Sequence, residues 1–598
     1  MLSGLQRLPH CGRPNVTAFL ASDDAALITG HTLVVDAGLI MAGWGERLAD
    51  DRRHVWKGEM RLTSALVAFT LCAGAAQSEA RSGRPAGDGT ASAPAAARPW
   101  RIRTLVPGSS FHTINGLALD GDGAVYAGSV AGEAIFRTRD FRHVETLVGP
   151  PLGQADDLVV TRDGSVIWTV IREGIVRRRD PDGTVRDIAT GIAGVNPIAL
   201  TPDGQRLFVG QMLYGDSLWE VDPQGRRPAR KLIAGVGWLN GFTVGQDGWI
   251  YAPVYSKGEV ARIDPDSSKV NILGTGFEHP TSVRIARDGS VLVLESATGI
   301  IWELRDGQRR RIAKLAAGLD NFVVRPDGQL LVSNMGNGSI VVVDPVGGST
   351  KALISARLAF PSDIAVDGNR LVVADSFALR GVDRRTGAVS DILRPVVSGL
   401  YPATALSVAG DKAVLTSEML GAVQIVDLKN TTLERTVLGA EGATDAIRTQ
   451  DGRLFALLPA KGELVELADE RQRVVARGLK APAGLEDGRD GSVIVAESGS
   501  GSLLSINLAD GKAYTIAGGL GTPRSVAIGR TGFAVLDVGG RKAWWVDRAT
   551  GKARIIAHDL PVGHLRKPYP RSGGIAMDAA GTVYIAADET NAIYAISR

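Results

Sequence analysis

The sequence predicts an all-β protein made of two tandem six-bladed β-propellers, which follow a signal peptide and a linker. From residue 113 onward, a unit of roughly forty residues recurs twelve times. Each unit contains short apolar strands joined by D-G turns. Glycine is abundant at 74 residues, whereas aromatic residues make up only 5% of the chain. This composition suits β-structure with many tight turns.

The repeated unit begins with an apolar strand, an x-D-G turn and a second apolar strand, and two more strands follow. Clear copies are NGLALDGDGAVYAGSV (115–130), NPIALTPDGQRLFVGQ (196–211) and DNFVVRPDGQLLVSNM (320–335). Alternating apolar strands joined by D-G turns are typical of β-hairpins. Four strands in a unit of this length are typical of one propeller blade.

The strand count divides the twelve repeats into two rings. The last repeat ends after its third strand, and two extra strands stand outside the repeats, RIRTLV (101–106) and TKALIS (350–355). The second follows PVGGS (345–349), which we expect to be a hinge between the two domains. We expect the first to complete the blade of repeat six and the second that of repeat twelve, which leaves no open edge. Propeller 1 would then span 100–346 and propeller 2 would span 347–598. A single twelve-bladed ring is disfavoured because its channel would be wide and empty.

The segment before the repeats has the features of an export signal. Residues 60–80 read MRLTSALVAFTLCAGAAQSEA, with an arginine, an apolar run and a small-residue cleavage pattern. The run is too short for a membrane span. A buried strand is the alternative, but 81–99 is an Ala/Pro/Gly linker that no core could use. The sequence therefore predicts a periplasmic or secreted protein whose translation starts at Met60.

Residues 14–43 contain FLASDDA followed by ITGHTLVVDAG. This stretch resembles the C-terminal end of short-chain dehydrogenases. The glycine-rich loop and the Tyr-x-x-x-Lys pair of that family are absent, so no dehydrogenase is expected. We interpret 1–59 as the remnant of a neighbouring reading frame.

Charge and cysteine content exclude several functions. The formal net charge is only +3 and the charges are interspersed, so nothing favours nucleic acid or an anionic membrane surface as a partner. The two cysteines, Cys11 and Cys72, precede the repeats. The propellers therefore contain neither a disulfide nor a thiolate metal site.

Each innermost strand starts at the mouth of the central channel, so one residue per repeat forms a ring there. Seven residues before the Asp of each D-G turn, propeller 1 has Asn115, Asp156, Asn196, Asn240, Thr281 and Asp320. Asp157 and Asn321 lie next to this ring. Converging oxygens suit a hard cation such as Ca²⁺ or another divalent ion. The alternative is that Asn and Asp cap the strand starts through local backbone hydrogen bonds.

The equivalent ring positions of propeller 2 distinguish between these two interpretations. Its approximate ring positions are Ser362, Thr404, Thr444, Ala483, Arg524 and Gly573. Since the same fold does not require carboxamides there, a metal or ligand site in propeller 1 is favoured over capping. Propeller 2 is expected to be structural or to bind something else, such as a protein partner.

The motifs NGLA (115–118), NPIALTPDG (196–204), NGF (240–242) and DNFVVRPDG (320–328) resemble those of six-bladed calcium-dependent lactonases. These are the senescence-marker/gluconolactonase and paraoxonase group, with strictosidine synthase as a structural relative. The resemblance covers roughly 100–346. It implies a Ca²⁺ site built from Asn196, Asn240, Asp320 and Asn321. Asn115 stands where that family has a Glu from the first blade.

By this resemblance, the substrate is a small molecule such as a lactone. The cation would polarise the lactone carbonyl, and Asp156 would be the base that activates water. A binding or scaffold propeller without activity is one alternative. A lyase similar to streptogramin-opening enzymes is another, but it needs a His and a Glu at the mouth. His112 and His279 are near strand starts, and we interpret them as solvated loop side chains.

Overall fold

The computed structural model describes residues 99–598 except 110, 213, 356, 377, 395–397, 419, 469–470 and 565–572. The remnant, the signal peptide and all but the last residue of the linker expected before residue 100 lie outside the described residues. The described chain forms β-sheets throughout, with a short 3₁₀ turn, η3 (Tyr255–Lys257). Within that part of the chain, no helix is both long and apolar enough to cross a membrane.

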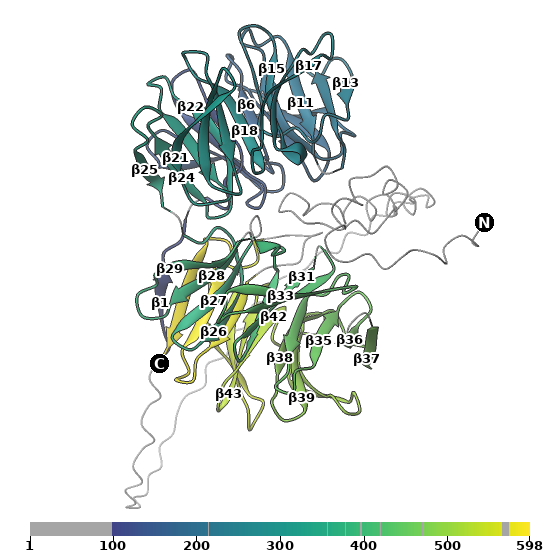
Figure 1. The fold of residues 1–598 in the computed structure, drawn as a ribbon. Helices are drawn as coiled ribbons and strands as arrows, with labels where there is room; N and C mark the ends of the chain where they lie inside the picture. Colours follow the sequence, from purple (N-terminus) through teal and green to yellow (C-terminus); the bar gives the residue numbers. More distant parts are fainter. Residues whose placement is uncertain are drawn as a thin grey trace, which may run out of the picture.

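The strands form twelve four-stranded antiparallel sheets, and six of them make up propeller 1, the upper body in Figure 1. Its blades are, in chain order: β2 (Leu117–Leu119), β3 (Val125–Ser129), β4 (Ala134–Thr138), β5 (Val144–Val148); β6 (Leu158–Val160), β7 (Val166–Val170), β8 (Ile175–Arg179), β9 (Val185–Ala189); β10 (Val195–Leu200), β11 (Leu207–Gln211), β12 (Ser217–Val221), β13 (Arg230–Ala234); β14 (Thr243–Val244), β15 (Ile250–Val254), β16 (Glu259–Ile263), β17 (Val270–Thr275); β18 (Pro280–Ile285), β19 (Val291–Glu295), β20 (Ile300–Arg305), β21 (Gln308–Lys314); and β22 (Leu319–Val324), β23 (Leu330–Asn334), β24 (Ser339–Val343), β25 (Thr350–Ile354).

The other six sheets make up propeller 2. Its blades are β26 (Pro361–Asp367), β27 (Arg370–Asp375), β28 (Ala378–Asp383), β29 (Val389–Leu393); β30 (Ala405–Ala409), β31 (Lys412–Ser417), β32 (Ala422–Asp427), β33 (Thr432–Leu438); β34 (Asp445–Arg448), β35 (Leu454–Leu458), β36 (Glu463–Ala468), β37 (Arg471–Ala476); β38 (Pro482–Asp487), β39 (Ser492–Glu497), β40 (Ser502–Asn507), β41 (Ala513–Ala517); β42 (Pro523–Ile528), β43 (Gly532–Asp537), β44 (Lys542–Asp547), β45 (Ala553–Ala557); and β46 (Gly574–Met577), β47 (Val583–Ala587), β48 (Ala592–Ser597), which are joined by β1 (Arg101–Val106).

Contacts between innermost strands show that these sheets close into two rings of six. In propeller 1 the innermost strands are neighbours in chain order, and β2 contacts β22 to close the ring. In propeller 2 the same succession ends with β46 against β26. The predicted fold class, two six-bladed propellers, is confirmed.

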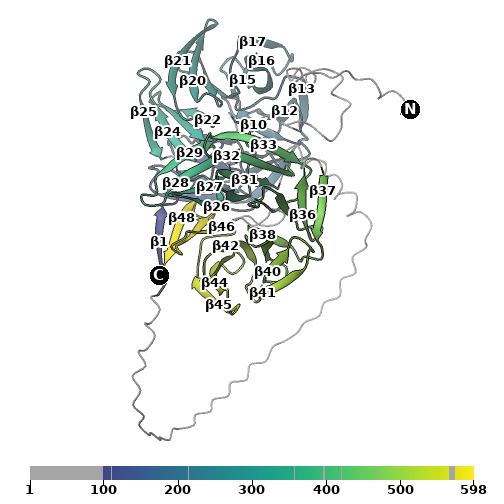
Figure 2. The same cartoon turned by 60° about the horizontal axis from the view of Figure 1, so that its bottom comes forward.

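The prediction for the two extra strands was wrong, because each completes the other ring. β1 pairs antiparallel with β48, beside which it lies in Figure 2, while β25 pairs with β24. The segment PVGGS (345–349), expected to be a hinge, lies instead in the hairpin turn between β24 and β25. Asp344 and Ser349 close this turn through a backbone hydrogen bond of 2.9 Å, and Gly348 supplies a φ of +70°.

Propeller 1 is therefore inserted into propeller 2 between β1 and β26, and its sheets end at Ile354. Propeller 2 is closed by a shared strand that comes from the other end of the domain. Propeller 1 has no such strand, because each of its blades is made of four consecutive strands.

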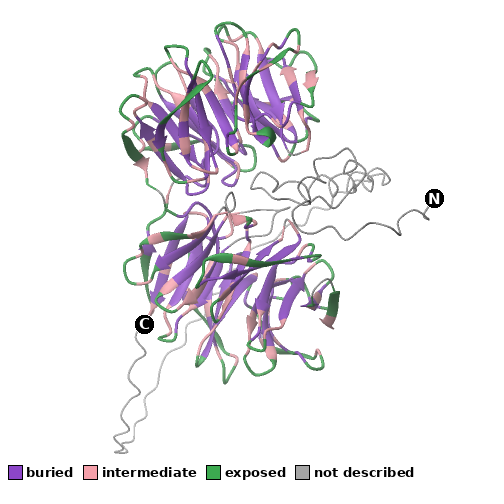
Figure 3. Ribbon diagram, in the orientation of Figure 1, coloured by how far each residue is buried: buried purple, intermediate pink, exposed green. Residues whose placement is uncertain are grey.

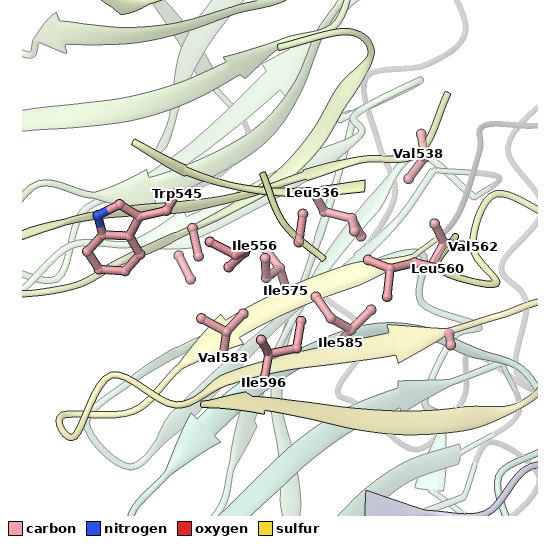
Figure 4. Close-up of a cluster of buried hydrophobic side chains, with 14 of the residues drawn as sticks. Leu536, Val538, Trp545, Ile556, Leu560, Val562, Ile575, Val583, Ile585 and Ile596 are labelled. Atoms are coloured by element: carbon pink, nitrogen blue, oxygen red, sulfur yellow. The ribbon is translucent and has the colours of Figure 1, made fainter. Parts of the chain in front are cut away.

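The cores lie between neighbouring blades, where the central strands are buried on both faces (Figure 3). Figure 4 shows one such layer in propeller 2, in which Leu536 and Ile556 meet Ile575, Val583 and Ile585. Because both sheet faces contact an adjacent blade, the second strand of a blade is a nearly continuous apolar run, as in β7 and β23, whose residues are all buried. The rigid stack of blades fixes where each innermost strand begins, and so positions the channel mouth.

Candidate functional site

The six ring residues predicted for propeller 1 lie at or just before the starts of its innermost strands. Asn196, Thr281 and Asp320 fall within β10, β18 and β22, while the other three come shortly before β2, β6 and β14. Four are almost fully buried: Asn115, Asn196, Asn240 and Thr281. The two carboxylates, Asp156 and Asp320, are partly exposed.

Hydrogen bonds bring distant members of this ring together. Asn115 Nδ2 donates to Asp320 Oδ2 at 2.9 Å, which joins the first blade to the last. Asn321 Nδ2 donates to Asp157 Oδ1 at 2.9 Å, which joins the last blade to the second. The latter contact passes beside Gly116, where an added Cβ would lie 2.7 Å from the Asp157 Cα. Glycine is thus needed between these two side chains.

Asp156 and Asp320 form an acidic pair at the mouth. Burial raises the pKa of Asp320 to about 7, while the Asn115 hydrogen bond opposes the rise and Asp157 adds to it. Burial also raises the pKa of Asp156 well above its usual range, and the charges of Asp320 and Asp157 raise it further. Arg172 acts in the opposite direction on Asp156. Like charges that share a buried site retain a proton near neutral pH, as in other carboxylate pairs.

Asp157 has a capping role. Its Oδ1 accepts the N–H of Leu158 at 2.9 Å, and its Oδ2 accepts the N–H of Ile198 in the next blade at 3.3 Å. Burial raises its pKa to about 6, against the effect of Arg284. Propeller 2 repeats this arrangement with Asp363 and Asp445, each of which caps its own strand and the next blade. These carboxylates hold blades together.

Arg284 is a residue of the candidate site that the sequence interpretation missed. Its guanidinium donates to the carbonyl oxygens of Gly241 and Phe242 at 3.1 Å and to Asn321 Oδ1 at 2.7 Å. Its position in the strand offered a signal, since it is the one charged residue among the six equivalents. The others are Ala118, Val159, Ala199, Thr243 and Val323.

The donor set determines which residues could hold a divalent cation. Asn321 Oδ1 already accepts from Ser282, Arg284 and Phe322, so it has no lone pair left for a metal. Asn196 Oδ1, by contrast, is buried and has no hydrogen-bond partner in the described structure. Together with the carboxylate of Asp320, it fits an oxygen-liganded cation. The described residues contain no metal-ready group of three or more His, Cys, Asp and Glu, so amide oxygens and water would complete the shell.

Asn240 and Asn115 are partly engaged elsewhere. Asn240 Oδ1 accepts the N–H of Gly241 at 2.8 Å, a capping contact that leaves one lone pair. Asn115 Oδ1 accepts the N–H of Val130 at 3.1 Å. The capping alternative therefore describes part of the ring, whereas Asn196, Asp156 and Asp320 are left for a ligand.

His112 does not lie in solvent, so that interpretation was wrong. Its side chain is buried, Nδ1 lies 2.9 Å from Asn591 Oδ1, and its ring packs on His564 with centroids 4.6 Å apart. Burial and the charge of His564 lower the pKa of His112 to about 3. The connection to propeller 2 places it there, because Asn591 and His564 both belong to that domain.

His279 lies in a hollow of about 610 Å³ on the face of propeller 1 that carries the mouth. Its ring is 5.1 Å from that of Tyr255, and Glu278 and Lys257 also line the hollow. A His and a Glu are therefore adjacent two to three residues before Thr281. This pair is what the lyase alternative requires near the mouth.

The mouth of propeller 2 has a different composition. Arg524 donates to the carbonyl oxygens of Ala483 at 2.9 Å, Thr404 at 3.2 Å and Thr444 at 3.4 Å, which come from three blades. The guanidinium thus bridges the ring at the level where propeller 1 has carboxylates. Burial raises the pKa of nearby Glu486 to about 7.

Propeller 1 is thus a six-bladed propeller whose channel mouth carries carboxylates and carboxamides. Residues 100–298 match the family model described as SMP-30/Gluconolactonase/LRE-like region. The resemblance predicted from the motifs is confirmed for this part of the chain. No curated protein matches the sequence significantly.

Several solved structures are similar to the chain. Virginiamycin B lyase from Staphylococcus aureus is 14% identical over 46% of this chain and 96% of that chain, with a TM-score of 0.35. A structure described as a proposed gluconolactonase is 17% identical over 40% of this chain and 90% of that chain, with a TM-score of 0.33. An extracellular domain from B. thetaiotaomicron is 13% identical over 83% of this chain and 82% of that chain, with a TM-score of 0.29. At these scores the likenesses carry nothing about function.

Proposed function

We propose that the protein is an exported lactone or ester hydrolase whose active site is the mouth of propeller 1. One observation carries the proposal: a buried, unpartnered Asn196 oxygen in the same ring of strand starts as Asp156 and Asp320, whose pKa values are raised. Leaving such an oxygen unpaired costs stability, so it points to a ligand that completes it. The match of residues 100–298 to the gluconolactonase-type family supports the same class of substrate.

The proposed roles follow from the contacts. Asp320 and Asn196 would hold a divalent cation, with Asn240 contributing its remaining lone pair and Asn115 orienting the Asp320 carboxylate. When bound, such a cation supplies a Lewis acid that polarises the lactone carbonyl and stabilises the developing oxyanion. Asp156 accepts a proton from the attacking water, and its raised pKa makes its ionised form a stronger base. Arg284 donates to the Gly241 and Phe242 carbonyls, directly after Asn240, and so would hold this strand start in place.

Two other functions have specific support. A lyase would use Glu278 and His279, which line the same hollow next to the mouth. A binding or scaffold propeller would use the capping contacts of Asp157 and Asn321, which need no ligand. The proposal has three further parts. Residues 60–80 direct export, propeller 2 binds a partner, and the cation is Ca²⁺.

The test combines metal-dependent stability with turnover. Thermal unfolding of the protein would be measured with Ca²⁺ and with a chelator, and a panel of aldonolactones and aryl esters would be followed in a pH-stat. Asp156→Asn should lower kcat by about 10²-fold to 10⁴-fold with little change in Ca²⁺ binding, as expected for loss of a general base. Asn196→Ala and Asp320→Ala should abolish the Ca²⁺-dependent increase in Tm.

Asp327→Asn is the matched control, because Asp327 is an exposed turn residue in the same blade as Asp320. It should change neither the Ca²⁺ response nor turnover. If Ca²⁺ has no effect on Tm and no lactone is opened, the scaffold function is the correct one. Elimination products with loss of activity in His279→Ala would instead identify the lyase.

A further inference from the structure

We infer that contacts from propeller 2 hold the first and last blades of propeller 1 together and thereby position Asn115 and Asp320. We call this set of contacts the clasp. Propeller 1 has no strand shared between its first and last blades. Its seam, where β2 meets β22 and β23, is packed by an apolar cluster in which Leu117 and Ala127 of the first blade meet Leu331 and Ile340 of the last. Two hydrogen bonds also cross it: the one from Asn115 to Asp320, and one of 2.7 Å from Ser333 Oγ to the Asn115 carbonyl. Since no strand pairing joins these two blades in the described part of the chain, closure of the ring also depends on what holds its two edges.

On the first-blade side, the holding group is Asn591 of the turn between β47 and β48. This fully buried side chain donates from Nδ2 to the Phe111 carbonyl at 2.8 Å, and its Oδ1 lies 2.9 Å from His112 Nδ1. The His112 ring packs against His564 and Phe360 of propeller 2. Only two residues separate His112 from Asn115, so this contact fixes the start of the first blade.

On the last-blade side, the holding groups are two arginines of propeller 2. Arg394 Nη1 donates to the Ala317 carbonyl at 2.7 Å, three residues before Asp320. Arg380, which is only 3% exposed, donates to the Gly336 carbonyl in the turn between β23 and β24. Both guanidiniums also pair with Asp391, which belongs to the first blade of propeller 2.

The first connection between the propellers also bonds to the second connection and to a turn of propeller 2. Thr113 N–H donates to the Ala359 carbonyl at 3.3 Å, and Ser109 N–H donates to the Thr590 carbonyl at 3.1 Å. The Asp375 carboxylate accepts the N–H groups of Ala359 and Phe360 and also binds Arg380. The first and last blades of propeller 2, which are neighbours, therefore contact both sides of the seam. Asn591 and Arg394 are positioning residues for the mouth, whatever reaction occurs there.

Hydrogen exchange of the full-length protein tests the clasp without any substrate. The reporting amides are Asn115, Gly128 and Asn321, which donate within the two blades that meet at the seam, and Ile198 is the reference on another blade. Arg394→Met retains the apolar stem but loses the guanidinium. It should speed exchange at the seam amides by about tenfold relative to Ile198, as expected for loss of a charged hydrogen bond. Asn591→Asp, which keeps an acceptor but loses the donor to Phe111, should act on the same amides.

Arg453→Met is the matched control, since Arg453 makes comparable carboxylate bonds, to Glu466, wholly within propeller 2. It should leave seam exchange unchanged. Arg394→Lys should restore most of the protection, because lysine can still donate to the Ala317 carbonyl. Uniform acceleration over all blades, or no acceleration at the seam, would overturn the clasp. Neither outcome depends on hydrolytic activity, so failure of the clasp and failure of the hydrolase proposal are distinguishable.

Discussion

Asn115 donates its Nδ2 hydrogen to the Asp320 carboxylate across 2.9 Å, and this bond unites the first and last blades of propeller 1. It also opposes the effect of burial on the Asp320 carboxyl, whose pKa is nevertheless raised to about 7. A single amide therefore serves two purposes. It closes the ring, and it sets the charge of the candidate site.

Replacing this amide should raise the pKa of Asp320 further. In Asn115→Ala the stabilising hydrogen bond to the carboxylate is lost while burial remains, so protonation of Asp320 becomes more favourable. Carboxyl ¹³C chemical shifts, followed from pH 5 to 9, would report the change. Asn430→Ala is the control, because it removes an equal 2.9 Å amide to carboxylate bond at a turn of propeller 2. An unchanged or lower pKa in Asn115→Ala would contradict the expectation.

The sequence was sufficient for the fold class because short apolar strands recur in every blade and D-G turns in most of them. It was also sufficient for the ring positions, since turn spacing fixes where each innermost strand begins. It did not show which strand completes which ring, because RIRTLV and TKALIS are equally good strands. Pairing depends on the PVGGS turn and on packing of Leu105 and Val106 against the last blade of propeller 2.

The roles of individual ring residues were harder to predict, because they depend on contacts between blades. Asn321 and Asn196 are indistinguishable as residue types, yet Arg284 saturates the oxygen of the first and leaves that of the second free. His112 was misinterpreted for the same reason. Its partners Asn591 and His564 lie more than 400 residues further along the chain.

Arg284→Met should destabilise propeller 1 strongly. The change removes the cation that faces buried Asp157 and leaves Asn321 Oδ1 and two backbone carbonyls without this donor. Breaking a buried charge pair by removing one partner typically costs about 3–5 kcal/mol. Denaturant unfolding would measure the loss, and Arg284→Lys should recover part of it. Arg309→Met, at an exposed strand end, is the control, and an equal effect of the two methionine variants would refute the role of Arg284.

Glu486→Gln should stabilise propeller 2 at pH 8 and have little effect at pH 4. Burial raises the folded-state pKa of Glu486 to about 7, above the value of the unfolded chain. Such a group contributes stability that is fully present below the unfolded pKa and is lost as pH rises through about 7. Glutamine removes the cost of ionisation, an effect of about 3 kcal/mol at pH 8. We would measure the difference in unfolding free energy between variant and parent from pH 4 to 8, and it should grow as pH rises through about 7. For the exposed Glu145→Gln this difference should not change with pH.

His112→Phe should make the protein less sensitive to acid. The folded-state pKa of His112 is lowered to about 3 by burial and by the charge of His564, so its contribution is present above the unfolded value and lost as pH falls from 6.5 toward 3. Phenylalanine retains the packing on Phe360 and His564 but cannot take up a proton.

At pH 7 the variant should be less stable by about 1–3 kcal/mol, because Asn591 Oδ1 loses its buried donor. Between pH 6.5 and 4 it should lose less stability than the parent, so the two unfolding curves converge. Exposed His143→Phe should reproduce neither effect. If the unfolding free energies of His112→Phe and the parent fell in parallel with pH, acid would destabilise the protein through another group. If the two curves converge and the seam amides also exchange faster in the parent than in the variant at pH 5, the acid-sensitive contact lies where the two propellers meet.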